Sequence, residues 1–210
     1  MRVAPLLIGV ALVLETSATL AQPNLRSTFP GRRVGGGTRG ECTARVLAHL
    51  VPASSVYAPA AGGLIGLLEG PAANPRPVAI SFRQMNASGT SDAARSLLAS
   101  RDLPASGAGV TLFSQTLKGA TVWESRYRCD EAPGDPNDPL AMVSTEAPPA
   151  VSLLLMDATP ADTALQARLK DLRSFCGSTI PRDQLATAFD LADVVSGPDW
   201  PAQLPVRCPR

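Results

Sequence analysis

The chain has 210 residues, a formal charge of +1 at pH 7 and a hydrophobic share of 45%. This near-neutral balance produces no global electrostatic field that favours nucleic acid or an anionic membrane, and the ordinary hydrophobic share argues against disorder. The 20 prolines and 17 glycines, together with few aromatic residues, predict many turns and short structural elements.

Residues 1–21 have the pattern of a secretory signal peptide. Met1 and Arg2 form a positive start, residues 3–14 form an apolar run, and small residues lead to a predicted cleavage after Ala21. The apolar run is too short to cross a bilayer core of about 30 Å comfortably, and the alternatives are an uncleaved anchor or a buried helix. We therefore expect an exported protein, periplasmic or extracellular, with no transmembrane segment in the mature chain.

All four cysteines, Cys42, Cys129, Cys176 and Cys208, follow the predicted leader. An even number of cysteines in an exported chain favours disulfides, and four cysteines allow three pairings. We predict Cys42–Cys129 and Cys176–Cys208, because each pair then falls within one of two regions of different periodicity. With one histidine, His49, and no C-x-x-C pair, the sequence predicts no metal site and no cofactor.

The region 42–157 has the pattern of short strands separated by turns. In "RPVAISFRQ", Val78, Ile80 and Phe82 alternate with other residues, and "VSLLLMD" is the continuous apolar run of a strand covered on both faces. Several such segments between Pro- and Gly-rich turns predict a β-sandwich, immunoglobulin-like or related, although a barrel has the same signature. The segment 86–102 is ambiguous between a helical turn and a poor strand.

The region 158–210 changes to helical periodicity. Thr159 is a predicted N-cap, Pro160 occupies the first helical position and Gly177 closes the first helix. A second helix is predicted over residues 181–197. We therefore predict a C-terminal α-helical hairpin packed on the sandwich and followed by a Pro-rich tail, in a chain that is mainly β and α+β in total.

Residues 22–41 form a Gly/Arg-rich opening segment. Gly35, Gly37 and Gly40 match the spacing G-x-G-x-x-G of a dinucleotide-binding loop. That loop needs a strand before it, a helix after it and an acid about twenty residues later, and these features are missing here. The interpretation that we favour is a turn in which glycines permit positive φ and close backbone approach, clamped by Cys42.

Three arginines of this segment, Arg32, Arg33 and Arg39, are the candidate ligand-binding residues. Guanidinium groups beside exposed backbone N–H groups suit a carboxylate or phosphate. The alternative is that these arginines are solvated or form internal salt bridges.

Four segments in the same order carry a resemblance to a known family: "PGRRVGGGTRGEC" followed by "LVP", then "NPRPVAISFRQ", "LPASGAGVTLFSQTLKGATVWESRYRCD" and "VSLLLMDATPADTALQARL". Together they resemble the bacterial domain-of-unknown-function 928 family over most of the mature chain. The resemblance implies an architecture and no mechanism, since that family has no assigned activity. The chain departs from the family by leucines where tryptophan is usual in the last strand, and by Cys176 and Cys208 in place of an aromatic segment.

Trp123, Tyr127 and Cys129 share one face of a predicted strand. A tyrosine two residues before a cysteine is similar to the tyrosine corner of immunoglobulin domains. We interpret this face as core packing around a disulfide, with a ligand-binding aromatic patch as the alternative.

No catalytic residues are predicted. His49 lies in an apolar strand without a G-x-S-x-G partner, and no pair of carboxylates stands out. The leading functional hypothesis is a noncatalytic binding module of the bacterial cell envelope, whose partner is an envelope protein or an anionic ligand and not nucleic acid. The alternatives are an envelope hydrolase that uses His49 or paired carboxylates, and a purely structural envelope component.

Overall fold

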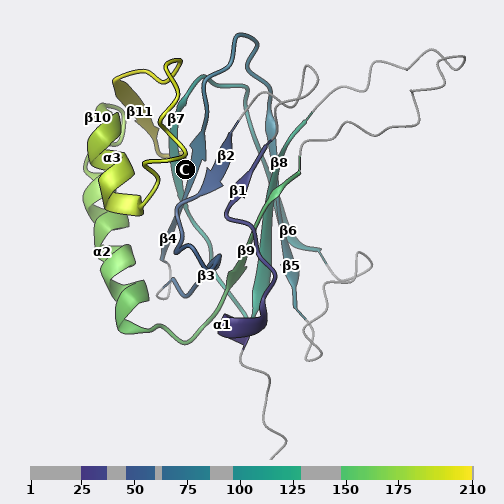
Figure 1. Cartoon of the computed structure of the whole chain (residues 1–210). Coiled ribbons are helices and arrows are strands. Elements are labelled where there is room, and N and C mark those ends of the chain that lie inside the picture. The colour runs from purple at the N-terminus through teal and green to yellow at the C-terminus, as the bar shows by residue number, and fades with distance from the viewer. Residues whose placement is uncertain (1–24, 37–45, 60–62, 86–96, 129–147, 210) are drawn as a thin grey trace, which may run out of the picture.

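The computed structural model describes residues 25–36, 46–59, 63–85, 97–128 and 148–209 (Figure 1). The predicted signal peptide, Arg39, Cys42 and Cys129 lie outside the described residues, and so does the predicted Cys42–Cys129 bond. Within these ranges no helix is long and apolar enough to cross a membrane.

The regular structure of the described residues is mainly β, with eleven strands in two sheets and three helices, consistent with the predicted sandwich. The six-stranded sheet has, in spatial order, β1 (Val34–Gly35), β2 (Leu47–His49), β4 (Leu64–Glu69), β7 (Gly109–Ser114), β11 (Gln203–Arg207) and β10 (Thr179–Pro181). The five-stranded sheet has β3 (Val56–Tyr57), β9 (Ala150–Leu154), β8 (Thr121–Tyr127), β5 (Val78–Gln84) and β6 (Leu97–Leu103). The ambiguous segment thus ends in a strand, β6.

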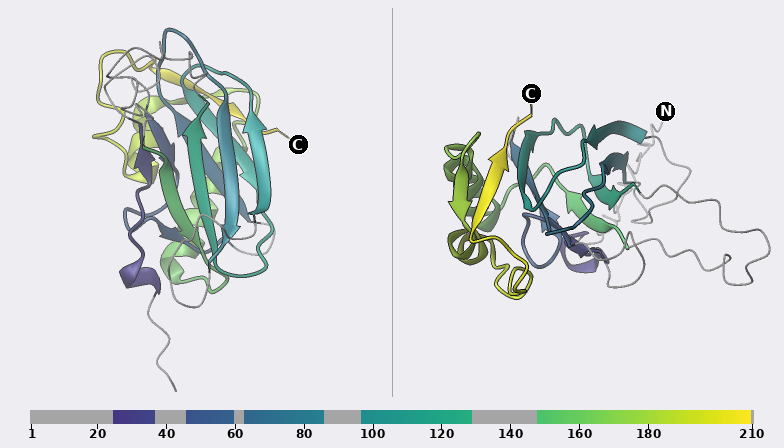
Figure 2. Two further views of the ribbon diagram at one scale, coloured as in Figure 1. Left: turned by 90° about the vertical axis from the view of Figure 1, so that its right-hand side faces the viewer. Right: turned by 90° about the horizontal axis from the view of Figure 1, so that it is seen from above.

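The main core lies between the two sheets, as the alternation in β5 predicted. Val78, Ile80 and Phe82 are buried in it, and the residues between them point to the opposite face of the five-stranded sheet. All six residues of β4 are buried, because a helix, α2 (Pro160–Arg173), covers the outer face of the six-stranded sheet (Figure 2). The layers are therefore helix, six-stranded sheet and five-stranded sheet.

The start of α2 follows the predicted cap. Thr159 and Asp162 form a capping box, and the Asp162 carboxylate also pairs with Arg26 at 2.9 Å. Arg26 belongs to a short helix, α1 (Leu25–Thr28), so this contact ties the first described residues to α2. Burial alone would raise the pKa of Asp162, but hydrogen bonds from Thr159, Ala58 and Arg26 lower this pKa below its ordinary value.

The C-terminal region differs from the predicted helical hairpin. A helix α3 (Arg182–Phe189) follows α2, but β10 lies between them, and α3 ends at Phe189 with Asp190 in the left-handed conformation. The tail forms β11, which pairs antiparallel with β10 and parallel with β7. The physical reason is the period of two in the tail, where Leu204 and Val206 are buried and their neighbours are more exposed.

The predicted Cys176–Cys208 disulfide is confirmed. The two Cα atoms lie 5.7 Å apart, and the bond closes a loop of sequence separation 32. It joins the end of α2 to the residue after β11, and the loop that it closes contains β10, α3 and β11.

The described part of the Gly/Arg-rich segment joins the two sheets along one edge. Gly35 pairs with Leu47 in the six-stranded sheet, and the neighbouring Gly36 N–H donates to the carbonyl of Pro148, just before β9. A Cβ atom on Gly35 would clash with the backbone nitrogen of Ala150 and lie 2.6 Å from the carbonyl oxygen of Pro148. Glycine at this position is therefore a requirement of close backbone approach.

We expect Gly35→Ala to lower the free energy of unfolding by about 2 kcal/mol, because the added methyl group forces the backbone before β9 to move. Urea unfolding followed by tryptophan fluorescence measures this change. Gly119→Ala is the matched control, because nothing lies within 4 Å of a Cβ atom at Gly119. An equal loss in both variants would contradict the proposed role of Gly35.

Candidate functional sites: a buried histidine and an arginine-bearing sheet face

His49, the single histidine of the chain, connects the two sheets through the core. It lies at the end of β2, and its side chain is fully buried. Its Nδ1 lies 2.8 Å from the hydroxyl of Ser152 on β9, and its Nε2 lies 2.9 Å from the hydroxyl of Ser125 on β8. Both ring nitrogens therefore have a partner on the opposite sheet.

Trp123 covers one face of the His49 imidazole. Its ring stacks on the imidazole of His49 with centroids 3.5 Å apart and an interplanar angle of 10°. Its Nε1 is buried and has no hydrogen-bond partner among the described residues. Burial lowers the pKa of His49 well below its ordinary value, so the ring is neutral in the folded protein. A general base must reach its substrate, and this imidazole is closed to solvent.

The aromatic face of β8 packs in the core, as we predicted, whereas the disulfide predicted beside it at Cys129 lies outside the described residues. Trp123 is fully buried, and Tyr127 is nearly so. The Tyr127 hydroxyl donates to the carbonyl of Val46 at 3.1 Å, which gives the buried phenol a partner on a neighbouring segment.

The structure separates the predicted arginines. Arg33 donates to the carbonyls of Val51 at 3.0 Å, Phe189 at 3.2 Å and Asp190 at 2.6 Å, and lies 3.6 Å from the Asp190 carboxylate. It therefore satisfies carbonyls at the C-terminus of α3, where a cation is favourable. This is the internal role that the sequence left open as an alternative.

Arg32 has the opposite placement. Its backbone forms an antiparallel bridge with Val151 of β9, and its side chain is exposed. Residues opposite each other in an antiparallel pair point to the same side of a sheet. Val151 alternates with core residues of β9, so Arg32 shares the outer face of the five-stranded sheet with Val151.

Further arginines lie on this outer face. Val151 is opposite Glu124 of β8, and Glu124 is opposite Ser81 of β5. The same side of the sheet therefore carries Arg126 and Arg128 from the β8 segment and Arg83 from β5, as well as Asp102 from β6. We call these residues with Arg32 and Glu124 the arginine face.

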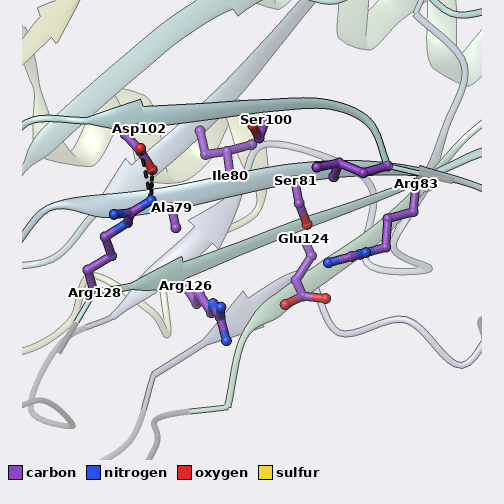
Figure 3. A pocket seen from close by; sticks show the side chains of 10 residues that line it. Ala79, Ile80, Ser81, Arg83, Ser100, Asp102, Glu124, Arg126 and Arg128 are labelled. Carbon is purple, nitrogen blue, oxygen red and sulfur yellow. Dashed lines mark hydrogen bonds and ion pairs between the residues drawn. The ribbon is translucent and has the colours of Figure 1, made fainter. Parts of the chain in front are cut away.

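The centre of the arginine face is a shallow depression of about 180 Å³ (Figure 3). Its floor has the small side chains Ala79, Ser81 and Ser100, which lie side by side on β5 and β6. Longer charged side chains from β8, β5 and β6 surround this floor, so the difference in side-chain length creates the hollow.

The charged groups around the depression differ in their contacts. Arg128 and Asp102 form an exposed ion pair with an Nη2–Oδ1 distance of 2.7 Å. Arg83 and Glu124 are half-buried, and the side chain of neither forms a hydrogen bond or ion pair with another described residue. They extend toward the same side of the depression in Figure 3.

Sequence reasoning did not single out Arg83, Arg126, Arg128 or Glu124. The signal was present as charged residues at the alternate positions of "RPVAISFRQ" and "ATVWESRYRC". Such residues are also typical of any solvated sheet face, so the pattern alone does not distinguish a binding face.

Comparison with known proteins identified no relative of this chain. No protein-family model matches it, and no curated protein and no solved structure is significantly similar to it.

Proposed function

We propose that this chain is a noncatalytic binding module of the bacterial cell envelope that holds an anionic partner on the arginine face. The observation that carries this proposal is the placement of four arginines, Arg32, Arg83, Arg126 and Arg128, on one open sheet face with two carboxylates. Guanidinium groups recognise carboxylate and phosphate through charge-assisted hydrogen bonds. Arg32 connects this face with the arginines that the sequence singled out.

The proposed location outside the cytoplasm rests on two observations. The Cys176–Cys208 disulfide is the type of bond that persists in oxidising compartments, and residues 1–21 have the sequence pattern of a secretory signal peptide. An immunoglobulin-like relationship and membership of the domain-of-unknown-function 928 family are part of the same proposal, and the segments quoted above support them.

The alternative functions differ in their support. A hydrolase that uses His49 is disfavoured, because both ring nitrogens have buried serine partners and the ring is closed to solvent. A purely structural envelope component is the second candidate. It is favoured by Arg33, because the guanidinium of this residue donates hydrogen bonds to backbone carbonyls of the same chain and so has a structural role.

The test is binding to fluorescent poly-L-glutamate at low salt, with poly-L-lysine of the same length as the second probe. We expect Arg32→Ser/Arg83→Ser to weaken poly-L-glutamate binding about tenfold, since two exposed ionic contacts together contribute about 1.4 kcal/mol. The matched control is Arg168→Ser/Arg173→Ser, which removes the same charge from exposed positions of α2. Equal weakening in the two variants, or tighter binding of poly-L-lysine, would refute the proposed face.

A further inference from the structure

Arg83 and Glu124 are an unusual pair within the arginine face. Arg83 is opposite Val122, and Glu124 is opposite Ser81, so the two charged residues are diagonal neighbours on β5 and β8. Both are half-buried, yet the side chain of neither forms a hydrogen bond or ion pair with the other or with any other residue in the described part of the chain. Arg128 and Asp102, on the other side of the same depression, do pair with each other.

The Arg83 guanidinium and the Glu124 carboxylate both line the depression without pairing with each other. Together they are complementary to a ligand that carries one negative and one positive charge. A carboxylate on the ligand suits a guanidinium fork, and an ammonium group suits a carboxylate. The two ligand groups must lie close together, because Arg83 and Glu124 come from adjacent strands, which are about 4.8 Å apart. An α-amino acid carries its carboxylate and ammonium on one carbon atom.

We propose that the depression binds a small zwitterion of the α-amino-acid type, with its carboxylate on Arg83 and its ammonium on Glu124. The inference rests on the proposed function of the arginine face, and it names the ligand class of that face. Arg126 lines the same depression and adds a second guanidinium on the Glu124 strand.

The volume of the depression and the exposed leucine in its lining restrict the choice of ligand further. The depression of about 180 Å³ is smaller than pockets for drug-sized ligands, which start at about 300 Å³, and therefore suits a single small molecule. Leu97 of β6 is opposite Arg83, also lines the depression, and is 51% exposed. An apolar ligand side chain would cover this leucine, so leucine is the first probe.

The experiment compares leucine with two analogues that each lack one of its charged groups. Binding is measured by amide chemical-shift changes on titration of the full folded chain. 4-Methylpentanoate lacks the ammonium group, and isopentylamine lacks the carboxylate. We expect leucine to bind about tenfold more tightly than either analogue, because each analogue leaves one charged partner unused. The shifted amides are expected on β5 and β8 around Ser81 and Glu124.

Two variants test which residue binds the carboxylate of the ligand and which binds its ammonium group. Glu124→Gln is expected to weaken leucine binding about tenfold but not 4-methylpentanoate binding, which gains from the loss of a neighbouring negative charge, whereas Arg83→Gln weakens both. Arg168→Gln on α2 is the matched control, and thermal unfolding of each variant verifies that it is folded. Equal affinity of leucine and 4-methylpentanoate in the native chain would overturn the zwitterion proposal and leave anion binding intact. If the native chain binds neither leucine nor poly-L-glutamate, both the zwitterion proposal and the proposed function are overturned.

Discussion

Replacing Cys176 and Cys208 with serine is expected to lower the free energy of unfolding by about 3 to 4 kcal/mol. The bond closes a loop of sequence separation 32, and loop closure of this length removes that amount of chain entropy from the unfolded state. Inside the loop lies β11, which joins the six-stranded sheet through parallel pairs of Val206 with Val110 and Arg207 with Thr111. This strand is therefore the element that depends most on the disulfide.

Urea unfolding of the double serine variant measures this loss, with far-UV circular dichroism as the probe. The double substitution is preferable to a reductant, because a reductant would also break the Cys42–Cys129 bond that the sequence predicts. Arg207 lies 3.5 Å from the buried carboxylate of Glu69, so β11 keeps an anchor when the disulfide is absent. Ser178→Ala, an exposed change nearby, is the control and should alter stability by less than about 0.5 kcal/mol. A double variant as stable as the native chain would contradict the role assigned to the bond.

As the pH falls below about 6.5, acidification is expected to destabilise the protein through His49, with a slope that approaches about 1.4 kcal/mol for each pH unit. The pKa of His49 is lowered in the folded state by burial, so the folded ring stays neutral while the unfolded ring takes up a proton. The unfolded state then binds more protons, and stability falls as the pH falls.

Unfolding free energies at a series of pH values test this expectation. Because the chain has one histidine, His49 is the only side chain of its type whose ordinary pKa lies near 6.5, where the slope is expected to begin. The lowered pKa of Asp162 places the stability loss of that carboxyl at lower pH, as the pH falls below about 3.8, which separates the two effects. His49→Gln should be less stable at neutral pH, because a buried serine hydroxyl loses its partner, and should show no slope. A wild-type slope retained in His49→Gln would refute the assignment.

The candidate site was predictable only in part. The sequence indicated Arg32 and Arg33 together, as adjacent members of one glycine-rich stretch. In an extended backbone, adjacent side chains point to opposite sides. The register with Val151 therefore sends Arg32 to the outer face, while Arg33 reaches the carbonyls at the end of α3. The segment itself contains no information about which arginine takes which side.

The histidine site was not predictable from the residues around His49. Its partners Ser125 and Ser152 are 76 and 103 residues away in the chain, and they come from the other sheet. Serines at inward positions of β8 and β9 carry no signal of their own. Only the packing of the two sheets places three polar groups in one closed cluster and gives each of them a partner.

The sequence alone predicted what depends on local patterns: the alternating face of β5 and the N-cap at Thr159. It also favoured the Cys176–Cys208 bond among the possible pairings. The tertiary structure decided what depends on contacts between distant segments. It converted the predicted Pro-rich tail into β11, because β7 offers a strand edge beside it, and it required glycine at position 35, because β1 approaches the start of β9 closely. Register, strand order and backbone proximity are properties of the assembled sheets, and no local pattern encodes them.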